Sequence, residues 1–596
     1  MNFDRHLVLF DCVNRALEFE EIQSMIPALF LFGCLLFVTA YRVYGRFLDR
    51  EMDVSDSRPT PANTLRDGVD YLPTPPMVLL GHHFSSIAGA GPIVGPIIAA
   101  MAFGWLPAAL WILLGAIFIG GVHDYTALMA SVRHGGHSIG DISRSMLTPV
   151  SRKLFLLFIF LTLVYVIIVF IDLTASSFAP RLLPHLDAET AAVQVRHGGI
   201  VATASTIFVV LAFGFGLTTQ KLGMRIGRSS LLFVPLVFFA VWIASKVPLT
   251  ADILPQFLGE ARQTWLLILL VYCMLASILP VWILLQPRDY LSSFLLYACL
   301  IGGSAGLMVS GLRGHTPTAY PYFLGWSDSN LGRIFPALFI TIACGAVSGF
   351  HSIVASGTSA KQLDRESSAK GISYGGMLIE GLLALLALST VMILKGQIGG
   401  NPVVIFANGL GSFLQALGVP AELSISFGLL AVSTFLLTTL DTCTRLARYL
   451  LQELFQWDNS LLHRVLGTLL VLLLPTLVIF RNIPGPSGIP LPAWQAIWPA
   501  FGASNQLLAA LALMVVYTWL RRKGRRALYI AIPALFMSIT TLSALIQLSI
   551  RHLLHQGSLF IGGISLGLCL LAIFVILNLL LTLHRTHSNL SPLPSK

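Results

Sequence analysis

Charged residues are scarce in this sequence. Only 11% of its 596 residues are Asp, Glu, Lys or Arg, against about a quarter in an average soluble domain. Polar linkers between domains are also missing, because long apolar runs follow one another from Ile26 to Leu583 with short connections. The composition therefore excludes a soluble multidomain protein and predicts one all-α, polytopic membrane domain over residues 1–596.

Cysteine patterns that would indicate a metal site or a redox site are absent as well. No CxxC pair or metal-ligand spacing occurs, and most of the cysteines lie within apolar runs, so we expect packing roles for them. They are Cys12, Cys34, Cys273, Cys299, Cys344, Cys443 and Cys569. No metal or other cofactor is expected.

The net charge of +10 does not indicate nucleic-acid binding, because the basic residues are spread over the loops between apolar runs. The N-terminus also lacks the basic segment and small-residue cleavage site of a signal peptide. Its first 24 residues carry five acidic side chains ahead of the first apolar run. We therefore expect the first helix to be retained.

About fifteen apolar runs are long enough to cross a bilayer as helices. They lie near residues 25–41, 77–103, 105–130, 154–179, 200–218, 229–245, 264–285, 290–312, 334–357, 374–394, 422–440, 465–480, 493–520, 527–549 and 559–583. The run 402–418 is short and interrupted by Asn408, Gly409, Gly411 and Gly418, which predicts a non-spanning or re-entrant helix.

The basic residues predict the orientation, because cytoplasmic loops carry the excess of Lys and Arg. Alternating assignment of the 37 basic residues places 26 on one side and 11 on the other. The N-terminus is thereby expected outside, in the periplasm, and the C-terminus inside, in the cytoplasm. If the run 402–418 were counted as a span, the basic stretch RRKGRR at 521–526 would be placed outside the cell. The distribution of basic residues therefore favours a run 402–418 that does not span the membrane.

The segment Gly81–Pro96 places Gly89, Gly91, Pro92, Gly95 and Pro96 within an apolar span. Glycine and proline at this density predict a broken helix. Unpaired backbone groups at membrane depth are tolerated where they face protein, water or a ligand, and transporters use such breaks as substrate sites. The alternative is close helix packing through small residues.

A second candidate break lies in Ala343–Lys361, where Gly345, Gly349 and Gly357 interrupt another apolar span. The two segments share a small-residue core with histidine and aromatic neighbours (HHFSSIAGAG and SGFHSIVASG). The predicted topology makes the two spans antiparallel, as an inverted repeat requires. A tight helix crossing is the alternative for this segment.

Ionisable residues within spans are energetically costly and are candidates for function. They are His82, His83, His123, Asp124, His351, Glu380 and Asp441. Glu380 is the favoured carrier of a coupling ion, because no basic residue lies near it in sequence. For the histidines a structural hydrogen bond and a transport role are both open, whereas Asp124 is expected to pair helices and Asp441 to pair with Arg445 or to serve in coupling.

Two polar segments remain. Leu284–Ser293 contains Arg288 and Asp289 after a proline, which predicts a rigid inner turn. The amides of Asn505 and Gln506 either bond a neighbouring helix or line a polar cavity.

Seven segments together resemble the carbon starvation protein A (CstA) family. They are Gly81–Pro96, Gly120–Leu128, Gln286–Ser293, Ala343–Thr358, Tyr374–Gly381, Leu440–Tyr449 and Trp498–Ala509. Members of this family are bacterial inner-membrane transporters implicated in uptake of peptides and of pyruvate, the latter with proton coupling. The resemblance implies a leucine-transporter-like core of inverted five-helix repeats.

We therefore expect a cation-coupled symporter, and not an enzyme, that imports pyruvate or a short peptide with the carboxylate at the first break. The coupling ion is a proton or sodium, the core spans 77–515, and the segments 25–76 and 516–596 are peripheral. The expected substrate-binding residues are His82, His83, Ser85, Ser86, Gly89, Gly91, Ser348, His351, Ser352, Asn505 and Gln506. The expected coupling residues are Glu380, Asp124, His123 and Asp441.

Two other classes are weighed. An intramembrane enzyme or haem protein could use His82, His83 and His123, but no HExxH, GxSxG or Cys-based haem motif is present. A channel is disfavoured because no repeated pore loop or ring-forming acidic segment occurs.

The topology has a direct test. A cysteine introduced by Lys523→Cys should be labelled by a membrane-impermeant thiol reagent only after the cytoplasmic face is exposed, because the partition of basic residues places this loop inside. Labelling of position 523 in intact cells would contradict the predicted orientation.

Overall fold

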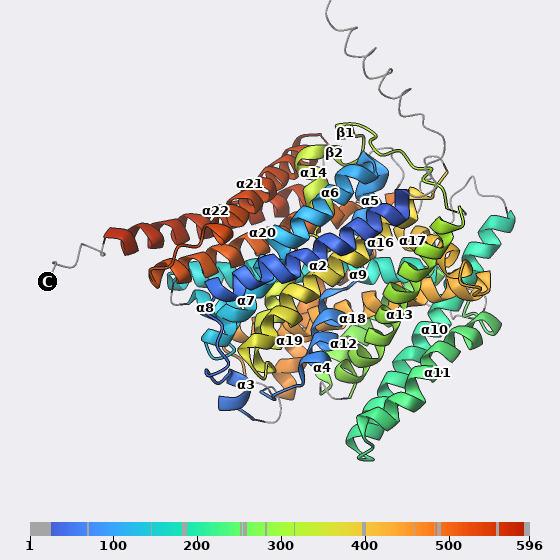
Figure 1. Ribbon diagram of the computed structural model, residues 1–596, viewed down its shortest axis with the longest axis horizontal. Coiled ribbons are helices and arrows are strands. Elements are labelled where there is room, and N and C mark those ends of the chain that lie inside the picture. The colour runs from blue at the N-terminus through green and yellow to red at the C-terminus, as the bar shows by residue number, and fades with distance from the viewer. Residues whose placement is uncertain are drawn as a thin grey trace, which may run out of the picture.

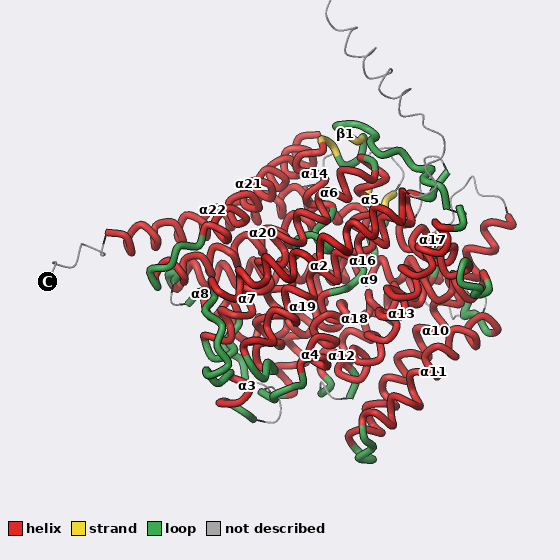
Figure 2. The backbone as a smooth tube through the Cα atoms, viewed as in Figure 1, coloured by secondary structure: helices red, strands yellow, loops and turns green. Residues whose placement is uncertain are grey.

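The computed structural model describes residues 25–67, 71–144, 146–180, 188–250, 253, 259–280, 283–314, 316–395, 401–458, 460–481, 483–484, 490–555 and 559–588. Regular structure in these residues is almost entirely helical (Figure 2). The all-α prediction is confirmed. The prediction that the first helix is retained rests partly on the acidic N-terminal segment. That segment lies outside the described residues.

The α-helices follow the predicted apolar runs, since each run forms at least one helix. They are α2 (Met25–Glu51), α3 (Pro61–Thr64), α4 (Pro76–Ile87), α5 (Gly91–Phe103), α6 (Trp105–Gly115), α7 (Gly121–Arg133), α8 (Ile139–Ser143), α9 (Pro149–Phe178), α10 (Ala188–Gln220), α11 (Ile226–Lys246), α12 (Ala261–Ile278), α13 (Leu285–Leu312), α14 (Ile334–Thr341), α15 (Gly349–Gly357), α16 (Gly375–Met392), α17 (Pro402–Gln415), α18 (Ala421–Phe455), α19 (Leu461–Ile479), α20 (Ala493–Arg522), α21 (Leu528–Ile550) and α22 (Leu559–Ser588).

Shorter elements connect or interrupt these helices. Three are π-helical turns, η1 (Ala116–Gly120), η4 (Lys370–Tyr374) and η5 (Arg551–His555), and two are 3₁₀ turns, η2 (Ser359–Lys361) and η3 (Glu366–Ser368). The strands β1 (Ser327–Asp328) and β2 (Gly332–Arg333) pair antiparallel, as do β3 (Ile483–Pro484) and β4 (Pro490–Leu491).

Among the described residues, 13 helices are long and apolar enough to cross a membrane, or 14 when α4 and α5 are taken as one broken span. The predicted span 334–357 consists of two shorter helices, α14 and α15, separated by seven residues. The protein is therefore a multi-pass membrane protein. The predicted count of fifteen spans and the inverted repeat stay predictions.

The segment 402–418 is helical in its first part only. Helix α17 has 14 residues, which at 1.5 Å per residue is about 21 Å and shorter than the ~30 Å hydrocarbon core. It packs against α13, α16 and α18. The prediction that this helix is non-spanning or re-entrant stays a prediction.

The predicted rigid turn at Leu284–Ser293 is wrong. Helix α13 begins at Leu285 and runs without interruption to Leu312, so Arg288 and Asp289 lie in its first two turns and are buried. Pro287 does not break the helix, because an N–H in the first helical turn has no intrahelical acceptor to lose.

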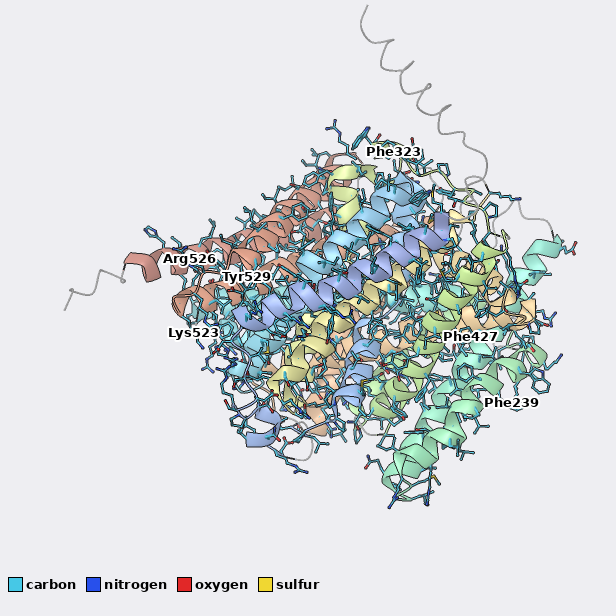
Figure 3. All side chains as sticks on the ribbon, viewed as in Figure 1. Phe239, Phe323, Phe427, Lys523, Arg526 and Tyr529 are labelled. Atoms are coloured by element: carbon cyan, nitrogen blue, oxygen red, sulfur yellow. The ribbon has the colours of Figure 1, made fainter. Side chains whose placement is uncertain are left out.

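The helices assemble around the broken α4–α5 pair (Figure 1). Helices α13 and α16 contact this pair, while α9 packs against both α18 and α20. The α10–α11 hairpin lies at one edge and α21 and α22 lie at the other. The labelled Lys523 and Arg526 lie on the left of the same view, away from Phe239 on the right (Figure 3).

Both predicted breaks are present. Helix α4 ends at Ile87 and α5 begins at Gly91 with a bend of 45°, and the backbone is unwound from residue 342 to 348 between α14 and α15. The breaks touch, since a Cβ added to Gly91 would lie 2.5 Å from Cys344 Cβ. A Cβ on Gly95 would lie 2.6 Å from the carbonyl oxygen of Thr341.

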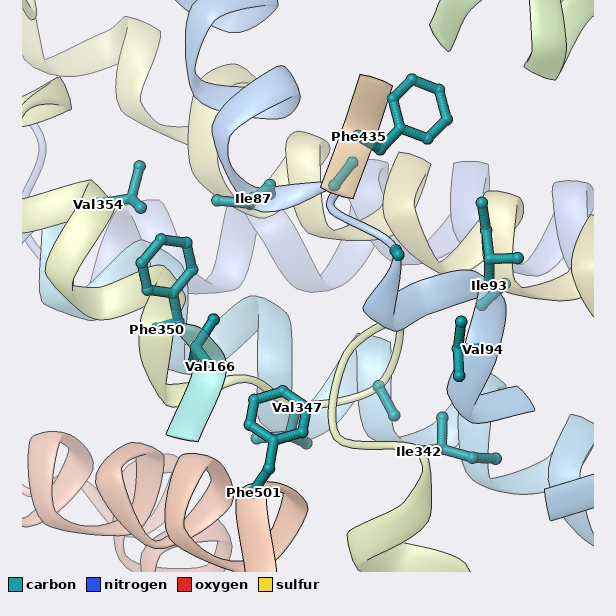
Figure 4. Packing of buried hydrophobic residues seen from close by; sticks show 14 of the residues in the cluster. Ile87, Ile93, Val94, Val166, Ile342, Val347, Phe350, Val354, Phe435 and Phe501 are labelled. Atoms are coloured by element: carbon teal, nitrogen blue, oxygen red, sulfur yellow. The ribbon is translucent and has the colours of Figure 1, made fainter. Parts of the chain in front are cut away.

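Apolar side chains surround the contact between the two breaks. Ile87, Ile93 and Val94 flank the first break and Ile342, Val347 and Phe350 flank the second (Figure 4). All six are buried. The unwound backbone is therefore enclosed by protein.

Gly345 allows a test of the second break. Its φ is +84°, and a Cβ there would lie 2.7 Å from Ala384 Cβ. Gly345→Ala should lower the midpoint of thermal unfolding in detergent, because positive φ costs about 1–2 kcal/mol in a residue with a Cβ and the contact adds to it. Gly357→Ala is the matched control, since nothing lies within 4 Å of a Cβ there. Equal midpoints for the two variants would contradict the described break.

Candidate functional site

His351 lies between two carboxylates at the contact of the two breaks. Its Nδ1 is 2.9 Å from Asp124 Oδ2, and its Nε2 is 3.3 Å from Glu380 Oε2. His123 Nδ1 is 2.7 Å from the other oxygen of Asp124. All four side chains are buried and come from α7, α15 and α16. The predicted coupling residues Glu380, Asp124 and His123 thus lie in one group with His351.

Two π-helical turns position the carboxylates. The turn η1 ends four residues before Asp124, and η4 ends six residues before Glu380. Gly121, the first residue of α7, packs against Tyr374 of η4, since a Cβ added to it would lie 2.5 Å from the Tyr374 ring. Such turns shift the face that the following helix presents and are frequent at functional sites. Here they turn both carboxylates toward α15.

Side chains of neighbouring helices satisfy the unwound backbone of the second break. Glu380 Oε1 accepts the N–H of Gly345 at 3.1 Å, and Asn505 Oδ1 accepts the N–H of Phe350 at 3.0 Å. Gln506 Nε2 donates to the carbonyl oxygen of Ile342 at 3.2 Å. Two roles were open for Asn505 and Gln506. In the structure their amides form hydrogen bonds to a neighbouring segment, the second break. Ser348 joins the same group, because Asn505 Nδ2 donates to its hydroxyl at 3.0 Å.

The group combines two buried carboxylates with two imidazoles and contains no arginine or lysine among its described members. Two ionised carboxylates and two neutral imidazoles would place two negative charges in a buried volume, which is energetically unfavourable. One proton shared between His351 and Glu380 would reduce the net charge of the group from two negative charges to one. Within the described residues His351 Nε2 and Glu380 Oε2 make no other hydrogen bond, so both atoms are available to hold that proton.

A second buried group contains Arg288. Its guanidinium forms an ion pair with Asp441, donates to Asp289 Oδ1 at 2.8 Å and donates to the hydroxyl of Tyr272 at 2.9 Å. The alternative pairing of Asp441 with Arg445 is wrong. Arg445 donates instead to the carbonyl oxygens of Ala276 and Leu279, because its side chain extends past the end of α12.

A third buried pair joins Arg262 at the start of α12 to Asp172 on α9. Asp172 also accepts the N–H of Trp494 at 2.9 Å. Arg262 and Tyr272 are ten residues apart on α12, or about 15 Å along its axis. Sequence reasoning missed this pair, although an aspartate within the apolar run 154–179 was a visible signal.

The remaining predicted residues have local partners. His83 Nδ1 is 2.8 Å from Ser359 Oγ, and His82 Nδ1 is 3.9 Å from Asp289 Oδ2. Ser85, Ser86 and Ser352 donate to the carbonyl oxygens of Asp289, His82 and Gly349. Gly89 packs against Thr439. The three histidines of the haem or enzyme alternative have three different partners, so they form no common ligand set here.

Cys344 was expected only to pack, but it lies at the centre of the site. Its sulfur, a ring nitrogen of His351 and a carboxylate oxygen of Glu380 lie within 4.8 Å of one another. The sequence held no signal for this, because the residues lie on both sides of an unwound segment whose path depends on the fold.

A multi-pass helical protein with buried, partly unpaired ionisable groups at two helix breaks belongs to the class of membrane proteins that move solutes. The family described as carbon starvation protein CstA matches residues 26–400 and 397–544. The chain therefore belongs to the carbon starvation protein CstA family.

Curated relatives extend this assignment over most of the chain. The peptide transporter CstA of Bacillus subtilis (strain 168) is 33% identical, covering 85% of this chain and 88% of the relative. The pyruvate/proton symporter BtsT of Escherichia coli (strain K12) is 30% identical, covering 86% and 80%. A crystal structure of the Eremococcus coleocola manganese transporter aligns at 13% identity and a TM-score of 0.40, covering 88% of this chain and 99% of that chain. A likeness this distant identifies no solute.

The Arg288 group predicts a stability effect. Arg288→Gln should lower the thermal midpoint strongly, because removing one partner of a buried ion pair costs about 3–5 kcal/mol. Adding Asp441→Asn should restore part of the loss, since one of the two carboxylates left without the guanidinium is then neutral. Arg445→Gln with and without Asp441→Asn is the control, and a rescue of equal size there would contradict the assigned pair.

Proposed function

We propose that this protein is a secondary active transporter that imports a small carboxylate-bearing nutrient, pyruvate or a short peptide, together with a proton. The observation that supports the proposal most is the position of His351. It bridges Asp124 and Glu380 where two broken helices meet. The relatives named as a peptide transporter and as a pyruvate/proton symporter support the solute class.

The atoms of the site favour a proton over sodium. Hard cations take a shell of oxygen ligands. The group around His351 offers an imidazole nitrogen and the Cys344 sulfur beside the Glu380 oxygen, a set suited to a proton shared between nitrogen and oxygen. The same geometry makes Asp124 an orienting residue, because its contact with Nδ1 turns Nε2 toward Glu380.

The proposed place for the substrate carboxylate is the space that opens when the breaks separate. The N-termini of α5 and α15 both begin at a break, and helix N-termini favour anions. In the described conformation Gly91 packs against Cys344 and Gly89 against Thr439, so protein occupies this contact. Substrate binding therefore requires α5 and α15 to move apart, as alternating access does.

The buried ion pairs suggest where such motion is restrained. In the predicted topology Arg262–Asp172 lies toward the periplasm and Arg288–Asp441 toward the cytoplasm. Arg262 belongs to α12, and Arg288 donates to Tyr272 of the same helix. We propose that the protein lies in the bacterial inner membrane with its N-terminus in the periplasm.

Uptake by purified protein in vesicles tests the proposal. Labelled pyruvate, lactate, alanine and dipeptides are offered with an inward proton gradient, an inward sodium gradient or neither. Accumulation of pyruvate or dipeptide with the proton gradient supports the proposal. Accumulation with the sodium gradient alone would exclude proton coupling, and conversion of the solute without accumulation would indicate an enzyme.

Glu380→Gln separates coupling from binding. It should abolish gradient-driven accumulation but permit some exchange of internal for external substrate, because the amide oxygen can still accept the Gly345 N–H while the side chain cannot cycle a proton. Asp124→Asn should weaken accumulation and exchange together, since it acts through the orientation of His351. The matched control is Glu422→Gln on the exposed first turn of α18, which should leave both activities unchanged. If Glu380→Gln accumulated substrate normally while Asp124→Asn lost coupling, Asp124 and not Glu380 would be the coupling carboxylate.

A further inference from the structure

Cys344, His351 and Glu380 combine a sulfur, a nitrogen and an oxygen donor at one point inside the protein. Their donor atoms lie within 4.8 Å of one another, and His351 Nε2 and Glu380 Oε2 are already 3.3 Å apart. A tetrahedral zinc ion with bonds of 2.0 to 2.3 Å places its ligand atoms about 3.3–3.7 Å apart. The spacing of the nitrogen and the oxygen already fits such an ion, and the sulfur lies close enough to need a shift of about 1 Å.

The two free donors point to a ligand. His351 Nε2 and Glu380 Oε2 are fully buried, face each other at 3.3 Å and make no hydrogen bond to a third group among the described residues. Buried polar atoms need a partner, so the two atoms need a cation between them, whether a proton or a metal ion.

The surroundings supply the outer contacts that metal sites need. A metal-binding histidine commonly presents one nitrogen to the metal and donates the other N–H to a carboxylate. Asp124 is such a carboxylate, because its Oδ2 lies 2.9 Å from Nδ1 of His351. Gly345 N–H holds the second oxygen of Glu380, and Asn505 Nδ2 lies 3.8 Å from the Cys344 sulfur.

The charges also match a divalent cation. A cysteine thiolate and the Glu380 carboxylate together carry two negative charges, which a divalent ion neutralises in a buried volume. Binding displaces the thiol proton and the proton shared by His351 and Glu380. Thiolate and imidazole ligands select zinc-like ions over magnesium or calcium, which prefer oxygen.

We propose that Cys344, His351 and Glu380 form a site for a divalent cation of the zinc and cadmium class, which competes with the coupling proton and blocks transport. The inference rests on the same site as the proposed function, but it does not depend on which solute is carried. Its consequence is a transporter that soft divalent cations inhibit and magnesium does not.

Cadmium binding to purified full-length protein provides the test, because cadmium–thiolate bonds absorb in the near ultraviolet whether or not transport occurs. The wild type should show this absorbance with one cadmium per chain, and Cys344→Ser should lose it. Cys443→Ser, which alters another fully buried cysteine, should keep it. His351→Gln should weaken cadmium binding at least tenfold, since even outer contacts of metal sites change affinity by about 10- to 100-fold.

Inhibition of uptake is the second readout. Zinc should inhibit the wild type and Cys443→Ser alike and inhibit Cys344→Ser at concentrations at least tenfold higher, while magnesium has no effect. Cadmium absorbance that persists in Cys344→Ser, or that is absent from the wild type, would overturn the inference and leave the proposed transport standing. Cadmium binding at Cys344 in a protein without proton-coupled uptake would keep the metal site and remove the proposed function.

Discussion

An ionisable side chain inside a membrane must be paired within the protein or neutralised by a proton. In this protein His351 is the shared partner of two buried carboxylates. Its two ring nitrogens face carboxylates from two different helices, at 2.9 Å and 3.3 Å. Among the described residues the ion pairs of Asp124 and Glu380 are with histidines alone, so no permanently charged side chain balances the two carboxylates. A fixed cation such as arginine at this position would hold the site in one charge state.

The backbone breaks make this arrangement possible. Glycines at 91, 95 and 345 allow the two unwound segments to touch, and Glu380 uses its second oxygen to hold the N–H of Gly345. The proton site and the path of the second break are therefore connected by one side chain. In the proposed mechanism, protonation of Glu380 weakens its hydrogen bond to the N–H of Gly345, and this would connect proton binding to motion of α15. The other buried pairs involve arginine, and they differ from the His351 group because arginine stays charged throughout.

Much of the fold could be predicted from the sequence, because apolar runs report membrane helices and dense glycine and proline report breaks. Glu380 could be singled out by the lack of a neighbouring base. The sequence could not show that His351 is its partner, since residues 124, 351 and 380 meet only after three helices and an unwound segment are in place. Asp441 shows the same limit: Arg445 is nearer in sequence, but Arg288 pairs with it through the packing of α13 against α18. Pro287 suggested a turn, but a proline in the first turn of a helix is compatible with that helix, as α13 shows.

Substrate-driven proton movement is the most direct test of the central claim that this buried group carries a coupling proton. Purified protein is placed in sodium-free vesicles that contain a pH-sensitive dye, with equal pH on both sides, and pyruvate or a dipeptide is added outside. The account predicts acidification of the interior that follows solute uptake and exceeds that in protein-free vesicles. Solute uptake without acidification, or uptake that begins only when sodium is supplied, would contradict it.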